Sequence, residues 1–213
     1  EAMDQIELIG AELGRVRGIA SLCADAVTDG GRIYCYSRYS SIAGDANTRR
    51  SGVSITRGLM ERDGELWDGQ KSEPFTGGTP NDTVVMGILK PDDPVDLKFL
   101  DYFKSQGMRV ASIGPMTRAM HEPEGRTVPK ETEIHAGRMC DTYGLFAVPG
   151  FEQKVCPTSG VLLNQLFWAV IMELIVEYRV RTGGDLPGVY FSAGLEGGRE
   201  HYRKWYNLDQ LNY

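Results

Sequence analysis

The sequence predicts a single α/β domain over residues 1–213, built on an open, mainly parallel sheet with helices on both faces. Apolar runs at residues 33–36, 83–89 and 109–113 alternate with stretches of helical periodicity. The run at 83–89 is continuous, which is typical of a strand buried on both faces. Such alternation implies right-handed βαβ units, and 213 residues are enough to bury one core.

The chain begins with an expected helix over residues 1–28, interpreted as an N-terminal helical arm on an α/β core and C-terminal helices at 29–213. Its apolar residues recur in steps of three and four, at Ile6, Ile9, Leu13, Val16, Ala20, Cys23 and Val27. Asp29-Gly30-Gly31 should end it. After the strand at 33–36 we expect a turn and a helix through Arg50. Residues 61–82 are rich in charge and turn formers and predict a long surface loop.

Two further helices follow the strands. Pro94 should start one helix and Gly107 should stop it. Thr158 should cap a second, which runs to about Arg181. Its segment 161–176 is apolar on nearly all sides, but it is short for a membrane span and contains polar residues, so we expect a core or subunit-interface helix and no membrane. A short extended segment at 189–191 and a last helix at 198–207 complete the chain.

Charge and cysteine usage exclude several classes of protein. The net charge of -6 argues against binding to duplex nucleic acid, which needs a basic face. The cysteines show no paired spacing, which predicts buried thiols in a reduced compartment; they are Cys23, Cys35, Cys140 and Cys156. The amino terminus lacks the features of a signal peptide, so a cytoplasmic location is expected.

Candidate ligand-binding turns follow the expected strands, because ligands of open α/β sheets bind beyond the carboxyl ends of the strands. The first turn offers hydroxyls, a guanidinium and free N–H groups at a helix start, from Ser37, Arg38, Tyr39, Ser40 and Ser41. This set suits a phosphate, although a Ser-rich helix cap that binds nothing explains it equally well.

The other candidate positions are weaker. Lys90 could contact an anion, but Pro91 and two aspartates favour a solvated loop. Thr158 or Ser159 could present a hydroxyl to a pocket, although helix capping alone accounts for both. Arg50 could reach an anion at the first turn only if the helix bends back or a second subunit supplies it.

Sequence motifs for nucleotide and metal sites are missing. No G-x-G-x-x-G follows the first strand, and the chain contains neither a P-loop nor a G-x-S-x-G elbow. His121 and His135 have no ligand-like spacing and are expected at the surface. We therefore expect no cofactor and no metal.

The order of elements and two motifs resemble the SIS (sugar isomerase) phosphosugar-binding family, and most closely its uncharacterised bacterial subgroup. VCPTSGVLLNQLFWAVIMELI at 155–175 resembles that subgroup's Pro-Thr-Ser segment and long apolar helix, and SAGLEGGREH at 192–201 resembles its terminal Ser-Ala-Asn, Gly-Gly, Glu-His sequence. GGRIYCYSRYSS and Arg50-Ser51-Gly52 match its amino half more loosely. The resemblance implies a flavodoxin-like three-layer α/β/α fold and a homodimer or homotetramer with a site shared between subunits.

The resemblance also implies roles for individual residues. In an aldose-ketose phosphosugar isomerase, His201 would handle the ring oxygen and Glu196 or Glu200 would move the carbon-bound proton. The alternative for Glu200 and His201 is that they only begin a terminal helix. The chain departs from the family after Leu89, where Lys90-Pro91-Asp92 replaces a Ser-x-Ser-Gly phosphate turn. That departure favours the alternative of a non-catalytic sensor of a sugar phosphate or other anion. A purely structural dimer would leave the Ser-rich turn unexplained.

Overall fold

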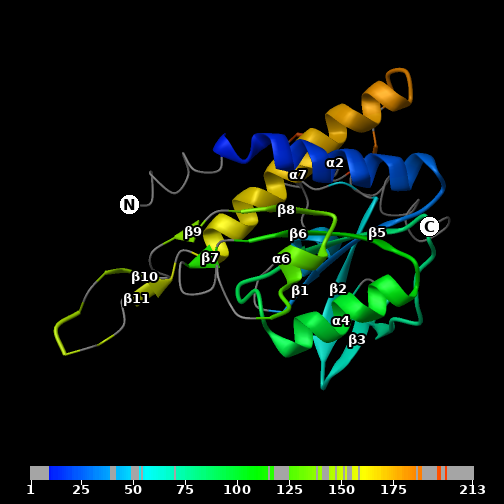
Figure 1. The fold of residues 1–213 in the computed structure, drawn as a ribbon. Coiled ribbons are helices and arrows are strands. Elements are labelled where there is room, and N and C mark those ends of the chain that lie inside the picture. Colours follow the sequence, from blue (N-terminus) through cyan, green and yellow to red (C-terminus); the bar gives the residue numbers. More distant parts are fainter. Residues whose placement is uncertain are drawn as a thin grey trace.

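The fold is an α/β arrangement around a seven-stranded, mostly parallel sheet (Figure 1). The computed structural model describes residues 10–38, 42–48, 53, 55–69, 71–114, 116–117, 125–137, 139–140, 144–146, 148–150, 152, 155–157, 159–185, 187–188, 196–197 and 200. The strands lie in the order β4-β3-β2-β1-β5-β6-β8. Their bounds are β1 Ile33–Ser37, β2 Thr56–Arg62, β3 Glu65–Asp68, β4 Glu73–Pro74, β5 Thr83–Gly87, β6 Arg109–Ile113 and β8 Ile134–Ala136.

The two central strands are β1 and β5, and every residue of both is buried. They are parallel to each other, with Ile33 opposite Thr83 and Ser37 opposite Gly87. Alternate side chains enter two separate cores, since Ile33 and Cys35 belong to one and Tyr34 and Tyr36 to the other. Burial on both faces is what the continuous apolar run at 83–89 predicted, and the parallel strands are confirmed.

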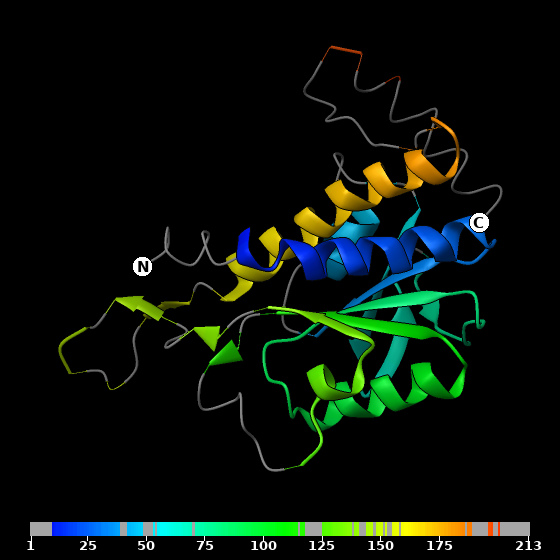
Figure 2. The same ribbon diagram turned by 45° about the horizontal axis from the view of Figure 1, so that its top comes forward.

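Helices cover the two faces of this sheet (Figure 2). On one face α2 (Leu13–Thr28), α3 (Ile42–Thr48) and α7 (Ser159–Arg181) pack over Ile33, Cys35, Val85 and Ala111. On the other face α4 (Pro94–Ser105) and α6 (Val128–Glu131) pack over Tyr36, Val84, Met86 and Val110. Two small sheets, β7 (Met116–Thr117) with β9 (Met139–Cys140) and β10 (Gly144–Phe146) with β11 (Val155–Pro157), lie outside the main sheet.

The first helix is part of the core, so the expectation of an N-terminal arm is wrong for α2. Val16, Ile19, Ala20 and Cys23 are fully buried against the sheet and α7. The helix ends before Gly30 as expected. Pro94 and Gly107 also bound α4 as expected, with Asp93 as the residue that caps its first turn. Of the four cysteines, Cys23 and Cys35 are described as free, buried thiols.

The prediction of a long surface loop at residues 61–82 is wrong, because the first part of this segment belongs to a β-hairpin. β2 and β3 are antiparallel and are joined by Asp63 and Gly64, both of which have positive φ, at 52° and 80°. An Asp-Gly pair is a favoured two-residue turn because it tolerates this backbone conformation. β3 then pairs with β4, so the segment extends the sheet beyond β2. The sequence likewise does not predict the short strand β8.

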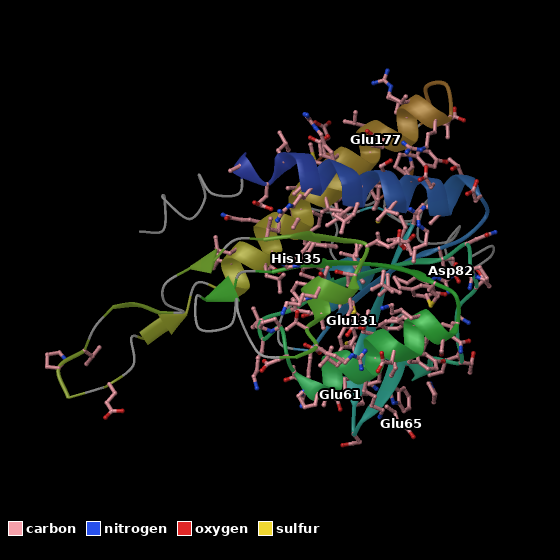
Figure 3. All side chains as sticks on the ribbon, viewed as in Figure 1. Glu61, Glu65, Asp82, Glu131, His135 and Glu177 are labelled. Carbon is pink, nitrogen blue, oxygen red and sulfur yellow. The ribbon has the colours of Figure 1, made fainter. Side chains whose placement is uncertain are left out.

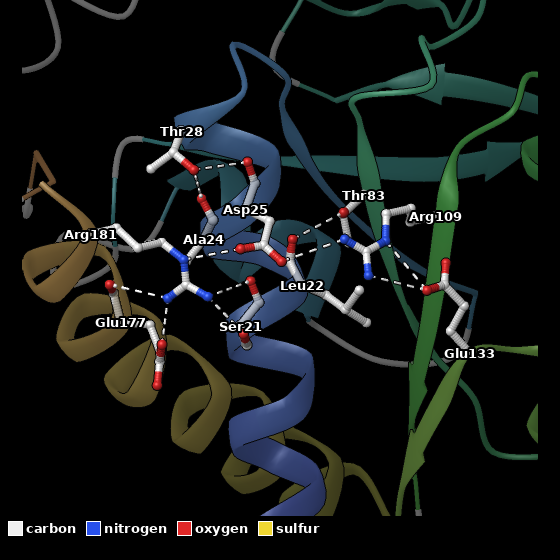
Figure 4. Close-up of polar contacts among 10 residues, drawn as sticks. All are labelled: Ser21, Leu22, Ala24, Asp25, Thr28, Thr83, Arg109, Glu133, Glu177 and Arg181. Carbon is white, nitrogen blue, oxygen red and sulfur yellow. Dashed lines mark hydrogen bonds and ion pairs between the residues drawn. The ribbon is translucent and has the colours of Figure 1, made fainter.

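Helix α7 lies alongside α2, and charged side chains join the two helices to the sheet (Figure 4). Arg17 pairs with Glu173, and two turns further along Asp25 pairs with Arg181 at 3.0 Å. Arg181 also donates to Ser21 Oγ at 2.7 Å and pairs with Glu177. Asp25 is shared with Arg109 of β6, which in turn pairs with Glu133. The network therefore connects α7, α2 and the start of β6.

By length and composition, residues 160–181 could cross a membrane, as could many core helices of soluble proteins. One side of α7 is buried against α2 and the sheet through Leu163, Leu166, Phe167, Val170 and Leu174. The other side exposes a stripe of apolar residues, Val161, Met172, Val176 and Val180. We call this set the α7 stripe.

Replacing Arg181 by Met should lower the free energy of unfolding by about 1–2 kcal/mol, because it removes ion pairs and hydrogen bonds at a partly buried site. Part of this loss should disappear in high salt, which screens the ion pairs. Urea denaturation at two ionic strengths measures the loss of unfolding free energy and its dependence on salt. Arg179→Met is the matched control, since Arg179 is exposed on the same helix. Equal losses in the two variants would contradict a stabilising role for the ion pairs and hydrogen bonds of Arg181.

Candidate functional site

The carboxyl ends of the parallel strands lie at one edge of the sheet, which we call the carboxyl edge. β1 ends there at Ser37, β5 at Gly87, β6 at Ile113 and β8 at Ala136. After β1 the chain moves to β2 on one side, and β5 lies on the other side of β1. In open α/β sheets a crevice forms where the strand order diverges in this way, and ligands bind in it.

Gly87 brings two of the predicted turns together. A Cβ atom added to Gly87 would lie 2.4 Å from Ile42 Cδ1 and 3.3 Å from Leu163 Cδ2, so the first residue of α3 and the second turn of α7 meet at the end of β5. Ser37 is the neighbour of Gly87 across the β1–β5 pair and is buried. The turn after Ser37 leads into α3, and Ser159 is the first residue of α7. The amino termini of both helices are therefore at the carboxyl edge.

Arg38, the predicted phosphate ligand, lies between carboxylates of the protein itself. Its Nη1 is 3.1 Å from Asp93 Oδ1, and its Nε is 3.8 Å from Glu61 Oε2. The guanidinium is half-buried. Figure 3 labels Glu61, which ends up near Arg38 because β2 runs alongside β1. An anion at the first turn must therefore compete with Asp93 and Glu61 for Arg38.

The amino terminus of α4 already holds an anionic group. The side chain of Asp93 accepts hydrogen bonds from the N–H groups of Val95 and Asp96, at 2.9 and 3.4 Å. A phosphate at this helix start would occupy the same position as the Asp93 carboxylate. Lys90 is exposed, and its Nζ is 3.9 Å from Asp92. This geometry fits the solvated-loop interpretation of Lys90 better than a ligand contact.

Beneath Arg38 lies a buried pair that sequence reasoning missed. Tyr36 OH donates to Asp96 Oδ1 at 2.8 Å, and both residues are almost completely buried. Among the described residues, Asp96 Oδ2 has no hydrogen-bond partner. The sequence predicts Tyr36 in a strand and Asp96 in the helix that Pro94 starts, without predicting that the two side chains meet. The sequence gives one sign of an unusual carboxylate, because the acidic residue Asp96 lies between the apolar residues Val95 and Leu97.

Burial controls the protonation of this pair. Loss of solvation is the largest effect on Asp96 and raises its pKa to about 6, from 3.8 for an ordinary aspartate. The Tyr36 hydrogen bond and Arg38 both lower this pKa, and Asp93 raises it. Burial, followed by the charge of Asp96, raises the pKa of the Tyr36 hydroxyl. Asp96 thus changes charge just below neutral pH.

Of the predicted proton-transfer residues, Glu196 lies away from the carboxyl edge of its own chain. Glu196 and Glu200 are exposed. The stretch at 196–197 lies at the top of Figure 2, with α7 between it and the sheet. The side chain of Ser159 lies outside the described part, as do the residues Tyr39, Ser40, Ser41, Arg50, Thr158 and His201. The expected segments at 189–191 and 198–207 fall almost wholly outside it.

The two remaining histidines are His121 and His135. His121 lies outside the described residues. His135, expected at the surface, is half-buried on β8 (Figure 3), and its Nδ1 is 2.8 Å from Ser112 Oγ. Ser112 also contacts Thr132 Oγ1 at 2.9 Å, so this trio joins β6 to the segment that carries β8. Within the described ranges, no group of three or more His, Cys, Asp or Glu side chains is arranged to hold a metal ion.

Neither a protein-family model nor a curated protein sequence matches this chain.

Substituting Asp96 by Asn should change how stability depends on pH. Because the pKa of Asp96 is higher in the folded than in the unfolded protein, the folded state binds more protons between about pH 4 and pH 6. The free energy of unfolding should therefore fall as the pH rises through this range, and the Asn variant should lack this loss. At pH 7 we expect the variant to be more stable by about 1–2 kcal/mol.

Urea denaturation from pH 4 to pH 8 measures this difference. Asp101→Asn is the control on the same helix, because Arg126 lowers the pKa of the exposed Asp101 and the effect has the opposite sign. A pH profile of Asp96→Asn that runs parallel to the wild type would show that Asp96 titrates normally.

Proposed function

We propose that the protein binds a sugar phosphate at the carboxyl edge, between the turn after β1 and the amino terminus of α7. The contact of Ile42 and Leu163 with Gly87 carries this proposal, because it brings the start of α3 close to the early part of α7. The parallel strands run in the order β2-β1-β5-β6-β8, which is the order of flavodoxin-like sheets. This order, with helices on both faces, supports the proposed flavodoxin-like three-layer fold and the SIS resemblance.

Among the helix starts at this edge, α7 is the best suited to a phosphate. α4 is excluded because Asp93 caps it. α3 has only seven residues, whereas α7 has 23 and a correspondingly complete helix dipole. No acidic residue lies in the first turn of α7. We therefore assign the phosphate to Ser159 and the adjoining Thr158, with Ser37, Tyr39, Ser40 and Ser41 on the opposite side.

The reaction proposed for this site is aldose-ketose isomerisation. A carboxylate removes the proton from the carbon next to the aldehyde while the aldehyde oxygen gains a proton, which gives an enediol. The carbon-bound proton then adds to the former aldehyde carbon while the hydroxyl on the second carbon loses its proton, which gives the ketose. We assign this step to Glu200 or Glu196, and ring opening to His201. Because α7 separates residues 196–197 from the sheet in one chain, these groups would be supplied by a second copy.

A non-catalytic sensor is the second candidate, and one observation favours it. The only cation described at the first turn, Arg38, is held by Asp93 and Glu61 rather than presented to a ligand. A site with this balance of charge binds phosphate weakly unless the ligand displaces a carboxylate. Turnover distinguishes the two candidates: an isomerase converts the phosphosugar that it binds, and a sensor returns it unchanged.

We also propose that the chain forms a homodimer through the α7 stripe. Met172, Val176 and Val180 lie one turn apart on the exposed side of α7, with 54–74% of each residue exposed. Glu173 and Glu177 beside them are paired with Arg17 and Arg181 of their own chain. Two copies of an apolar helix face with neutralised flanks can pack against each other with little cost in charge desolvation.

Replacing Ser159 by Asp should abolish binding of the phosphosugar without unfolding the protein. A carboxylate at this helix start interacts favourably with the helix dipole but repels a phosphate. A thermal-shift panel of aldose and ketose phosphates of five to seven carbons, each with its unphosphorylated sugar, measures binding. We expect a shift with one phosphosugar for the wild type and none for Ser159→Asp.

The matched control is Thr76→Asp, which adds the same charge to an exposed residue of the loop between β4 and β5. Its shift should equal that of the wild type. An undiminished shift in Ser159→Asp would exclude the α7 terminus as the phosphate site. If no phosphosugar shifts the wild type, the proposed ligand class is wrong.

Replacing Val176 by Glu should raise the dimer dissociation constant at least tenfold, because the packed copies would bury an unpaired charge. Sedimentation equilibrium measures the constant, with Thr76→Glu as a control of equal charge. A monomeric wild type at high protein concentration would contradict the dimer.

A further inference from the structure

Three elements, β1, β2 and α4, place four charged groups around one point near the carboxyl edge. Arg38 follows β1, Glu61 is on β2, and Asp93 and Asp96 are at the start of α4. Arg38 contacts Asp93 at 3.1 Å and Glu61 at 3.8 Å. Asp96 lies within the electrostatic reach of both Arg38 and Asp93. One guanidinium thus faces three carboxyl groups, and its position decides how their charges are balanced.

Asp96 is the member of this group that is hidden from solvent. It is 1% exposed, its Oδ1 accepts the Tyr36 hydrogen bond, and no described residue bonds its Oδ2. A buried carboxylate oxygen without a donor is costly in its ionised form. A proton on Oδ2 removes that charge, whereas a nearby cation stabilises it. The ionised form of Asp96 therefore depends on the positive charge of Arg38.

We propose that anion binding at the carboxyl edge draws Arg38 away from Asp93 and thereby causes Asp96 to take up a proton. The inference rests on the anion site proposed above and adds its regulation. In the free protein, Arg38 offsets part of the negative charge of Asp93, Asp96 and Glu61. When its guanidinium turns to the anion, the buried group loses one positive charge. One proton from solvent, added to Asp96 Oδ2, restores the balance.

The groups that face Asp96 set the direction of this coupling. Tyr36 donates to Asp96 from β1 and favours the carboxylate, and Arg38 does so through its charge. Asp93, on the same helix, favours the protonated form. Glu61 of β2 competes for Arg38 and so acts in the same sense as the anion. Removing the influence of Arg38 can only raise the pKa of Asp96 above its resting value of about 6.

A definite pH dependence of binding follows. Because the bound state holds Asp96 protonated at a higher pH than the free state, affinity should rise as the pH falls from 8 to 6. Asp96 has one pKa in the free protein and a higher one in the anion-bound protein. Between these two values the affinity for the anion changes by at most about tenfold per pH unit, and up to about one proton is taken up per anion bound. In this mechanism Asp96 is a positioning residue, because it acts on the ligand only through Arg38.

Isothermal titration calorimetry with sulfate tests the coupling. Sulfate keeps a constant charge between pH 6 and pH 8, so protons exchanged on binding belong to the protein. Titrations at pH 6.5 in buffers of different ionisation enthalpy give the number of protons taken up. We expect uptake by the wild type, the same uptake by Asp101→Asn, and none by Asp96→Asn, which should still bind sulfate. Arg38→Gln should bind more weakly and take up no proton.

The outcomes separate this inference from the proposed function. Sulfate binding without proton uptake, or uptake that persists in Asp96→Asn, would overturn the coupling and leave the anion site in place. Absence of binding by sulfate and by every phosphosugar would overturn the anion site and the coupling with it. Circular dichroism and urea denaturation of Asp96→Asn and Arg38→Gln show whether each variant is folded before its titration is interpreted.

Discussion

Burial of β1 and β5 on both faces is the constraint on which the rest of the structure depends. Each strand sends alternate side chains into two cores, so neither strand is stable unless helices cover both sides. α2, α3 and α7 meet this requirement on one face, and α4 and α6 meet it on the other. Because each helix after a parallel strand must return along the sheet, α3 and α4 begin at the same edge. The candidate site is a consequence of this geometry.

The parts of the fold that could be predicted are those with a strong local pattern. The apolar run at 83–89, the helix between Pro94 and Gly107, and the long apolar helix all have such patterns. The hairpin at β2 and β3 was missed because both strands carry several charges and β3 has only four residues, although Asp63-Gly64 is a turn signal. β8 has three residues and lies in a polar region, so its pairing with β6 depends on the sheet already being formed.

The site was predictable only where it follows directly from chain order. Ser37 ends β1, Arg38 follows it, and Ser159 begins α7, so their place at the carboxyl edge comes from the βα alternation. The partners of Arg38 and the Tyr36–Asp96 pair could not be predicted. Asp96 is 60 residues from Tyr36, and their contact depends on how α4 crosses β1. Two aspartates after Pro91 suggested only repulsion of anions, whereas Asp93 caps a helix and neutralises Arg38.

The outer strand β4 has a consequence for how copies of the chain can associate. It is two residues long, and its second residue, Pro74, has no N–H group to offer a further strand. Glu73 adds a charge at the same position. An open sheet edge that lacks donors and carries charge resists extension by other chains, as natural β proteins often do at their edges. Fibre-like growth by strand addition is therefore blocked at β4, which leaves helix faces for self-association on that side of the sheet.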